Sequence, residues 1–414
     1  MWWLAITHTE IAQRNLQFVP EYGRYDDLYI FVNTPLQDEA MTMFARQLLA
    51  DMVMEFPSLA GKWAKSCNTS SEESRRLGEI TRSYLHMTPR EYRRMLSKLR
   101  ERLKVLERLM SGKRFEEIDF SKIPSQAGLR YSHCFSTREE LKERYAEFMA
   151  KPEVKVNANV LYPYEVLHKA KSVWYRNYND VERIAVNKYW ENLPDIFEGK
   201  ECSMLCVCDT SGSMNGSGPA APINVAIGLS MYCAERLNGP FKNHYISFSS
   251  RPQLIETTNG RDFVERAENI YDTNLCENTN LIAVFDLLRN IASKPGFDKS
   301  TMPKTICVIS DMEIDDGTAN YDWRVGKRNS EWTKDSAQSV MEHIREEWAT
   351  LGLELPRLVY WNVEARHDTI LDLGPNVSLV SGASVNTFKS VVTGKNGVEL
   401  MLEAINSERY APIH

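Results

Sequence analysis

The stretch Ser203-Met-Leu-Cys-Val-Cys-Asp-Thr-Ser-Gly-Ser-Met214 decides the fold class of the second half of this 414-residue chain. Residues 202–208 form a nearly continuous apolar run, which is typical of a strand buried on both faces of a parallel sheet. A turn follows, and the pattern of residues 222–237 is helical. Asp209, Ser211 and Ser213 alternate within the turn, so one carboxylate and two hydroxyls can point at one place.

The rest of the second half alternates between strand-like and helical patterns. Strand-like runs recur at 245–248, 305–309, 358–363 and 377–380, and helical patterns fall near 281–291 and 336–351. This alternation predicts a doubly wound α/β domain over residues 198–414, with a parallel sheet covered by helices. In such sheets, ligands bind beside the carboxyl ends of the strands.

Two more oxygen-bearing side chains are expected at that edge of the sheet. Thr279 lies in the loop before the helix at 281–291, and Asp311 directly follows a strand. Together with Asp209, Ser211 and Ser213 they form a set of hard oxygen ligands, which suits Mg²⁺ best and also Mn²⁺ or Ca²⁺. The alternative is that Asp and Ser only cap a helix, because both residue types are preferred there.

The first half, residues 1–197, has helical patterns without strands. A Thr88–Glu91 capping box starts a helix that can extend to Gly112, and a Ser136–Glu139 capping box is expected to start another. The expected helices are 41–55, 89–112, 139–150, 164–171 and 180–193. This succession predicts an α-helical module, either a bundle or a HEAT-like stack.

Charge divides the chain in the same way. Residues 1–200 have a net charge of +3, and residues 201–414 have a net charge of −9. The stretch from Arg90 to Arg114 contains ten basic and only three acidic residues. Such a local excess favours a polyanion, and structured RNA is the expected partner, although a solvated helix face would look the same. The candidate RNA-binding residues are Arg93, Arg94, Lys98, Arg100, Arg102, Lys104 and Arg108.

Several function classes are disfavoured by the sequence. It has no apolar run long enough to cross a membrane, and its eight cysteines show no CxxC spacing, which favours a soluble cytoplasmic protein with reduced thiols. It has no HExxH, GxSxG, Walker or dinucleotide motif, so we expect neither catalysis nor a small-molecule substrate.

The order Asp209-x-Ser211-x-Ser213, Thr279, Asp311 resembles the metal-ion-dependent adhesion site of von Willebrand factor A domains. The resemblance implies that Asp209, Ser211 and Ser213 surround the cation. Thr279 would bind the cation directly or through water. Asp311 would bind it directly or through another of its ligands. It also implies an open coordination position, which a partner's carboxylate can complete.

A second resemblance lies near the N-terminus. Gly23-Arg-Tyr-Asp-Asp-Leu28 and residues 160–165 are similar to motifs of the TROVE module of Ro ribonucleoproteins and their phage, viral and plant relatives, which join helical repeats to a von Willebrand factor A domain. From the residues alone, Arg24 with Asp26 and Asp27 is better interpreted as an ion-pair network at a helix junction than as a ligand contact.

These observations together predict a non-catalytic RNA-binding protein of the Ro type, with a divalent-cation site that docks a partner. The competing hypothesis is a metal-dependent protein–protein adaptor that binds no RNA. A metal-dependent nuclease is the least supported alternative.

Overall fold

The computed structural model describes residues 1–175, 179–198, 202–249, 251–273, 280–312, 321–322, 327–328, 344–364, 369–374, 376–382, 385–393, 395 and 397–413. The chain divides into two units: Met1–Ile118 with Glu403–His414, and Asp119–Leu402. The predicted division at residue 197 falls inside the second unit, between the last helix before the sheet and the first strand of the sheet. It remains a prediction about sequence modules. Each unit is described by itself.

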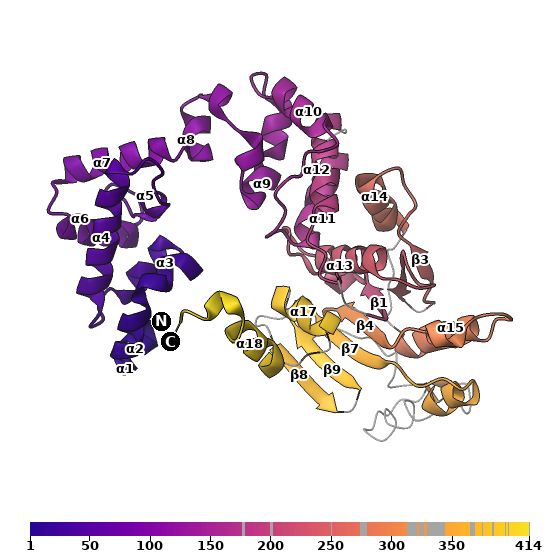
Figure 1. Ribbon diagram of the computed structural model, residues 1–414. Helices are drawn as coiled ribbons and strands as arrows, with labels where there is room; N and C mark the ends of the chain where they lie inside the picture. Colours follow the sequence, from indigo (N-terminus) through magenta and orange to yellow (C-terminus); the bar gives the residue numbers. More distant parts are fainter. Residues whose placement is uncertain are drawn as a thin grey trace. The chain divides into compact units, whose positions relative to one another are not determined.

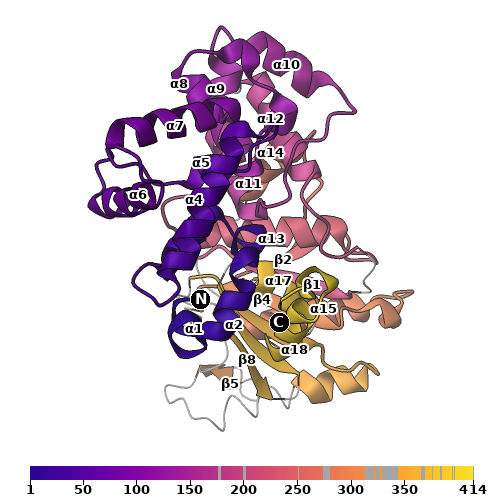
Figure 2. The same ribbon diagram turned by 60° about the vertical axis from the view of Figure 1, so that its left-hand side comes forward.

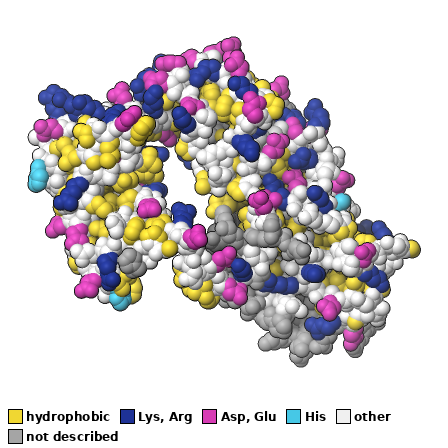
Figure 3. Space-filling view, in the orientation of Figure 1, with side chains coloured by type: hydrophobic (Ala, Val, Ile, Leu, Met, Phe, Trp, Pro, Cys, Tyr) yellow, Lys and Arg dark blue, Asp and Glu magenta, His cyan; other side chains and the backbone are white. Residues whose placement is uncertain are grey.

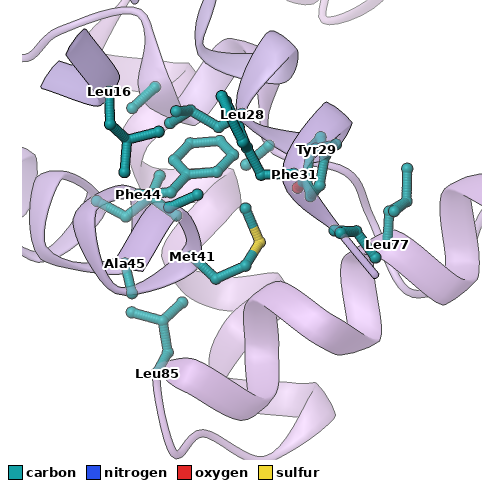
Figure 4. Packing of buried hydrophobic residues seen from close by; sticks show 14 of the residues in the cluster. Leu16, Leu28, Tyr29, Phe31, Met41, Phe44, Ala45, Leu77 and Leu85 are labelled. Atoms are coloured by element: carbon teal, nitrogen blue, oxygen red, sulfur yellow. The ribbon is translucent and has the colours of Figure 1, made fainter. Parts of the chain in front are cut away.

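The first unit is helical. Its helices are α1 (Trp2–Thr7), α2 (Thr9–Asn15), α3 (Val19–Tyr22), α4 (Gln37–Val53), α5 (Ala60–Trp63), α6 (Glu72–Tyr84), α7 (Pro89–Arg102) and α8 (Leu106–Ser111). The longest, α4, packs against α5, α6 and α7 (Figures 1 and 2). Phe44 and Met41 of α4 meet Leu28 and Phe31 of the 3₁₀ segment η2 (Tyr25–Phe31) in an apolar core (Figure 4).

The expected helix from 89 to 112 is broken in the structure. The Thr88–Glu91 capping box is confirmed, because Thr88 Oγ1 accepts from the Glu91 amide at 3.3 Å and the Glu91 carboxylate accepts from the Thr88 amide at 2.8 Å. However, α7 ends at Arg102, and Lys104 adopts a left-handed φ of 47° before α8 begins. Apolar residues continue at helical spacing across the break, which is why the sequence pattern did not reveal the break.

The second unit begins with four helices: α9 (Ser125–Thr137), α10 (Lys142–Ala150), α11 (Pro163–Trp174) and α12 (Asp180–Glu191). The last two confirm the helices expected near 164–171 and 180–193. The expected Ser136–Glu139 capping box is wrong, because both Ser136 and Thr137 belong to the end of α9. Their hydroxyls donate back to the carbonyl of His133, at 3.0 and 2.7 Å.

A seven-stranded sheet in the order β3-β2-β1-β4-β7-β9-β8 follows these helices. Strands β2, β1, β4, β7 and β9 are mutually parallel, and β3 and β8 are antiparallel edges. The strands are β1 (Met204–Asp209), β2 (His244–Phe248), β3 (Leu254–Glu256), β4 (Thr305–Ser310), β7 (Arg357–Asn362), β8 (Thr369–Gly374) and β9 (Val377–Ser381). All of the expected strands are therefore confirmed, and the two antiparallel edges were not expected.

Helices lie on both faces of the sheet. Cys206 and Cys208 of β1 face Cys233 and Ser230 of α13 (Pro222–Arg236). The alternate residues Leu205 and Val207 pack with α15 (Leu281–Ala292), as expected for a doubly wound domain. The unit also contains α14 (Phe263–Thr273), α17 (Val385–Thr393) and most of α18 (Gly397–Ile405). Of the helix expected at 336–351, residues 336–343 lie outside the described residues.

The helices before the sheet are built onto it. A Cβ on Gly228 of α13 would lie 3.0 Å from the backbone of Tyr164 in α11, so this glycine permits the close approach of the two helices. Trp190 of α12 stacks on Phe263 of α14 with 3.9 Å between ring centroids. Arg183 of α12 also forms a two-pronged ion pair with Asp262, at 2.7 and 2.9 Å. Because α11 packs against α13 on one side and β1 on the other, α13 is buried along nearly its whole length.

Candidate cation site and basic helix

The oxygen-rich site lies where β1 and β4 end. The two strands are adjacent and parallel, and Cys208 is paired with Ile309, so Asp209 and Ser310 are the next residues on each strand. Asp209 is fully buried, and Asp311, directly after β4, is 7% exposed. The sheet thus brings together two carboxylates that are 102 positions apart in the sequence.

Neutral donors hold the turn after β1 in place. Asp209 Oδ1 accepts from the Ser211 amide at 2.9 Å, and Asp209 Oδ2 accepts from the Ser310 hydroxyl at 2.6 Å. The hydroxyls of Ser211 and Ser213 are 3.1 Å apart. Because Ser211 is buried and Ser213 is exposed, these oxygens lead from the buried carboxylate to the surface.

The electrostatics of Asp209 favour a cation. Burial raises the pKa of Asp209, the hydrogen bonds from Ser310 and Ser211 lower it, and the negative charge of Asp311 raises it again, so the net shift is upward. The hydroxyl and amide groups that donate to this carboxylate are neutral. A divalent cation bound by both carboxylates would stabilise their ionised forms, and the all-oxygen donor set is what Mg²⁺, Mn²⁺ and Ca²⁺ prefer.

The structure places four of the five predicted ligands. Asp209, Ser211, Ser213 and Asp311 are at one edge of the sheet, whereas Thr279 lies outside the described residues. The next residue, Asn280, caps α15 by accepting from the Ala283 amide at 3.1 Å. Within the described part of the chain, no group of three or more His, Cys, Asp or Glu side chains is arranged to hold a metal, so a cation here would depend on hydroxyl ligands.

Sequence reasoning missed Ser310. Besides donating to Asp209, its hydroxyl lies 3.5 Å from Asp311 Oδ1 and accepts from the Met312 amide at 3.0 Å. The available signal was that Ser310, like Asp209, lies at the carboxyl end of an expected strand. The order of the strands in the sheet was needed to use that signal.

The seven basic candidates of the first unit separate into distinct roles. Arg100 donates to the carbonyls of Gly61 and Ala64 at 2.9 and 2.7 Å. Arg102 donates to the carbonyls of Asp51 and Met52 at 2.6 and 3.0 Å, at the end of α4. Both side chains therefore have structural roles that the sequence did not indicate, since their partners lie about 35 to 50 residues earlier in the chain.

The remaining candidates are exposed. Lys104 pairs with Glu117 at 3.5 Å, and Arg108 donates to Ser97 at 3.3 Å. For Arg93, Arg94 and Lys98, no carboxylate within the described residues lies at ion-pair distance. Figure 3 shows Lys and Arg side chains gathered at its upper left, where Figure 1 places α7. These three side chains form the exposed basic face of α7.

The Gly-Arg-Tyr-Asp-Asp motif builds a helix junction in the first unit. Arg24 Nε lies 3.2 Å from Asp26, and the Arg24 amide donates to Asp27 at 2.7 Å. A Cβ on Gly23 would lie 2.5 Å from that Asp27 carboxylate, so any other residue there would displace the carboxylate from the Arg24 amide. The interpretation of the motif as an ion-pair network agrees with this geometry.

The second unit is thus an α/β domain of mostly parallel strands, with an oxygen-lined site at the strand ends. The chain belongs to the family defined by the domain of unknown function DUF7788, whose family model matches residues 203–410. A second family model, the domain of unknown function DUF2828, matches residues 68–197. No helix in the described residues is both long and apolar enough to span a membrane.

Comparison with known proteins returns two kinds of relative. The uncharacterized protein L728 of Acanthamoeba polyphaga mimivirus is 26% identical over 378 residues, which cover 86% of this chain and 62% of that protein. The chain therefore spans less than two thirds of the length of this relative. The crystal structure of the Deinococcus radiodurans Ro (RSR) protein matches with a TM-score of 0.48 and 13% identity, over 92% of this chain and 83% of that one. A Ro protein, from the family that the motifs resemble, is therefore among the structural matches, but a likeness of this degree says nothing about function.

Proposed function

We propose that this protein is a non-catalytic RNA-binding protein whose α/β domain is of the von Willebrand factor A type and holds a divalent cation. One observation carries the RNA part of the proposal. Once the structural arginines are set aside, Arg93, Arg94 and Lys98 still form an exposed basic face on α7 without ion-pair partners among the described residues.

The basic face suits a phosphate backbone. Exposed cations without carboxylate partners need no ion pair to be broken before they contact phosphates, and each phosphate contact releases counterions. Such contacts fix the position of an RNA and do not by themselves read its bases. We therefore propose RNA recognition through shape and charge at this face.

The cation site supports the second part of the proposal. Asp209, Asp311, Ser211 and Ser213 suit Mg²⁺ first, with Mn²⁺ and Ca²⁺ as alternatives. We propose that a bound cation keeps one coordination position for a carboxylate of a protein partner, because the oxygens lead to the surface at Ser213. We propose no reaction at this site, because its two described carboxylates, Asp209 and Asp311, are assigned to the cation.

Salt-dependent RNA binding tests the RNA part. The full chain should bind a structured RNA more weakly as salt rises, and the double variant R94E/K98E should weaken binding about 100-fold at low salt and flatten the salt dependence. The matched control is R76E/K122E, which reverses two other exposed cations outside the basic face. If the two double variants bind RNA with equal affinity, the basic face is not the RNA-binding site. If the wild-type chain binds no RNA at low salt, the protein-adaptor hypothesis is favoured.

A further inference from the structure

A cleft of about 420 Å³ opens in the first unit beside the basic face. Its walls come from the loop before α6 and from α6, α7 and α8. The lining side chains that matter here are Ser66, Glu79, Arg93, Ser97, Arg100 and Arg108. A volume of this size falls within the range of small-ligand sites.

The break between α7 and α8 creates this cleft. Arg93, Ser97 and Arg100 share one face of α7, at helical spacing. In an unbroken helix, residue 108 would lie roughly 16 Å along the axis from residue 97. Instead the chain turns at Lys104, and Arg108 Nη2 comes within 3.3 Å of Ser97 Oγ. Three guanidinium groups therefore line one hollow.

Positive charge in the cleft is not balanced by its lining. Arg100 donates to the carbonyls of Gly61 and Ala64 and to the Ser66 hydroxyl, all of which are neutral. Burial lowers the pKa of Arg100, with Tyr92 acting in the opposite direction, and the nearby charge of Arg108 lowers it further.

Glu79 does not supply the missing negative charge. It is the only carboxylate among the lining residues, which all lie in the described part of the chain. Its Oε2 pairs with Arg82 at 2.6 Å, and Arg82 is not itself part of the lining. A bound anion would offset the repulsion between the cleft guanidiniums.

The donor chemistry points to a phosphate. One guanidinium group can donate two parallel hydrogen bonds to two oxygens of a phosphate, and serine hydroxyls can donate to the remaining oxygens. Three cations match a doubly charged phosphomonoester better than the singly charged diester of a nucleic acid backbone. Tyr92, Leu96 and Pro89 supply an apolar wall, so there is surface for a sugar or a base beside the phosphate.

We propose that this cleft binds a phosphomonoester, either the terminal phosphate of an RNA strand or that of a free mononucleotide. Only the first of these sources depends on the proposed RNA binding. The sequence patterns predict no small-molecule ligand, and they indicate only a general RNA surface for Arg93, Arg100 and Arg108.

Titration of the full chain with defined probes tests the proposal. The probes are adenosine monophosphate, adenosine, and one short RNA prepared with a phosphate at its 5′ end, at its 3′ end or at neither. The cleft variant is R108Q, which loses the hydrogen bond to Ser97 at an exposed position, and R93Q is a second cleft variant. The matched control is R90Q, which alters an exposed arginine of the same helix that neither lines the cleft nor belongs to the basic face.

We expect adenosine monophosphate to bind and adenosine not to bind. R108Q and R93Q should each weaken the binding of adenosine monophosphate roughly tenfold, while R90Q leaves its affinity unchanged. If RNA ends are the source, one phosphorylated RNA should bind about tenfold tighter than the hydroxyl-ended RNA, and R108Q should remove that preference. If only the mononucleotide binds, the proposal holds with a free nucleotide as the ligand.

The failures of the two proposals are distinguishable. If RNA binds equally well with and without a terminal phosphate, and adenosine monophosphate does not bind, the phosphate site in the cleft is wrong and the proposed RNA binding stands. If adenosine monophosphate binds through Arg108 and no RNA binds, the phosphate site stands and the proposed RNA binding is wrong. Phosphate-dependent binding that is unchanged in both R108Q and R93Q also overturns the cleft.

Discussion

At the residue scale, Asp209 has two possible roles that predict different behaviour. It accepts hydrogen bonds from Ser211 and Ser310, which would suffice for a residue that only caps a turn. Its raised pKa and the neighbouring Asp311 instead indicate a carboxylate that gains from a cation. The response of the protein to Mg²⁺ separates these roles.

We expect Mg²⁺ to raise the melting temperature of the full chain and D209A to abolish that rise, because a ligand that binds only the folded state stabilises it. Direct titration with Mn²⁺ should show at least a tenfold loss of affinity in D209A. The control D298A removes another carboxylate of the same unit, one that only accepts from Ser300, and should bind the cation as the wild type does. If D209A lowers the melting temperature equally with and without Mg²⁺, Asp209 is only a cap.

At the element scale, a buried carboxylate joins three helices of the second unit. Glu182 of α12 is 1% exposed, and it lies 2.8 Å from Lys169 of α11 and 2.7 Å from His133 of α9. Burial raises the pKa of Glu182, but the hydrogen bonds from Lys169 and His133 outweigh it, so the net shift is downward. Since the folded state lowers this pKa, the ion pairs stabilise the fold above the ordinary value of 4.5, and that contribution is lost as pH falls through the folded value.

E182Q should therefore destabilise the protein by about 3 kcal/mol at pH 7, because it leaves Lys169 poorly compensated among packed helices. The difference from the wild type should shrink at acid pH, as the pH falls below 4.5 and through the lowered pKa at which Glu182 itself becomes protonated. Denaturant unfolding at both pH values measures this, with E139Q as the control, since Glu139 is an exposed partner of Lys142. A pH-independent difference would show that shape matters at this position and charge does not.

The break between α7 and α8 is also an element-scale feature. The sequence predicted a helix through this region because six apolar residues recur at helical spacing: Tyr92, Leu96, Leu99, Leu103, Leu106 and Met110. The structure buries all of them except Leu103 and Met110, which are half-buried. The interruption depends on Lys104 adopting a left-handed conformation, for which a lysine gives no signal. Periodicity reports which residues are buried, and it does not report whether the axis between them is straight.

At the scale of the whole molecule, the helices before the sheet belong to the sheet's unit. Trp190 stacks on Phe263, Arg183 pairs with Asp262, and Gly228 lets α11 approach α13 closely. Removing α9–α12 would expose one side of α13, which is buried along nearly its whole length. The chain can therefore be divided before α9 and not between α12 and β1.

We expect a fragment of residues 119–402 to fold cooperatively and a fragment of residues 198–402 to aggregate or bind hydrophobic dye, because large exposed apolar patches are not tolerated in solution. Circular dichroism, thermal unfolding and gel filtration of both fragments compare them directly. A monomeric, cooperatively folded 198–402 fragment would instead favour the sequence-based division at residue 197.

The sequence by itself determined the elements and their order: the helical half, the strands at 202–208, 245–248, 305–309, 358–363 and 377–380, and the candidates Asp209, Ser211, Ser213 and Asp311. It could do so because burial periodicity and ligand chemistry are local properties of short segments. The tertiary structure decided what depends on distant partners. It placed Ser310 beside Asp209, tied Arg100 and Arg102 to backbone carbonyls, and folded Arg108 back toward Ser97. Each of these contacts joins residues that the sequence separates, and no local pattern specifies which distant atoms will meet.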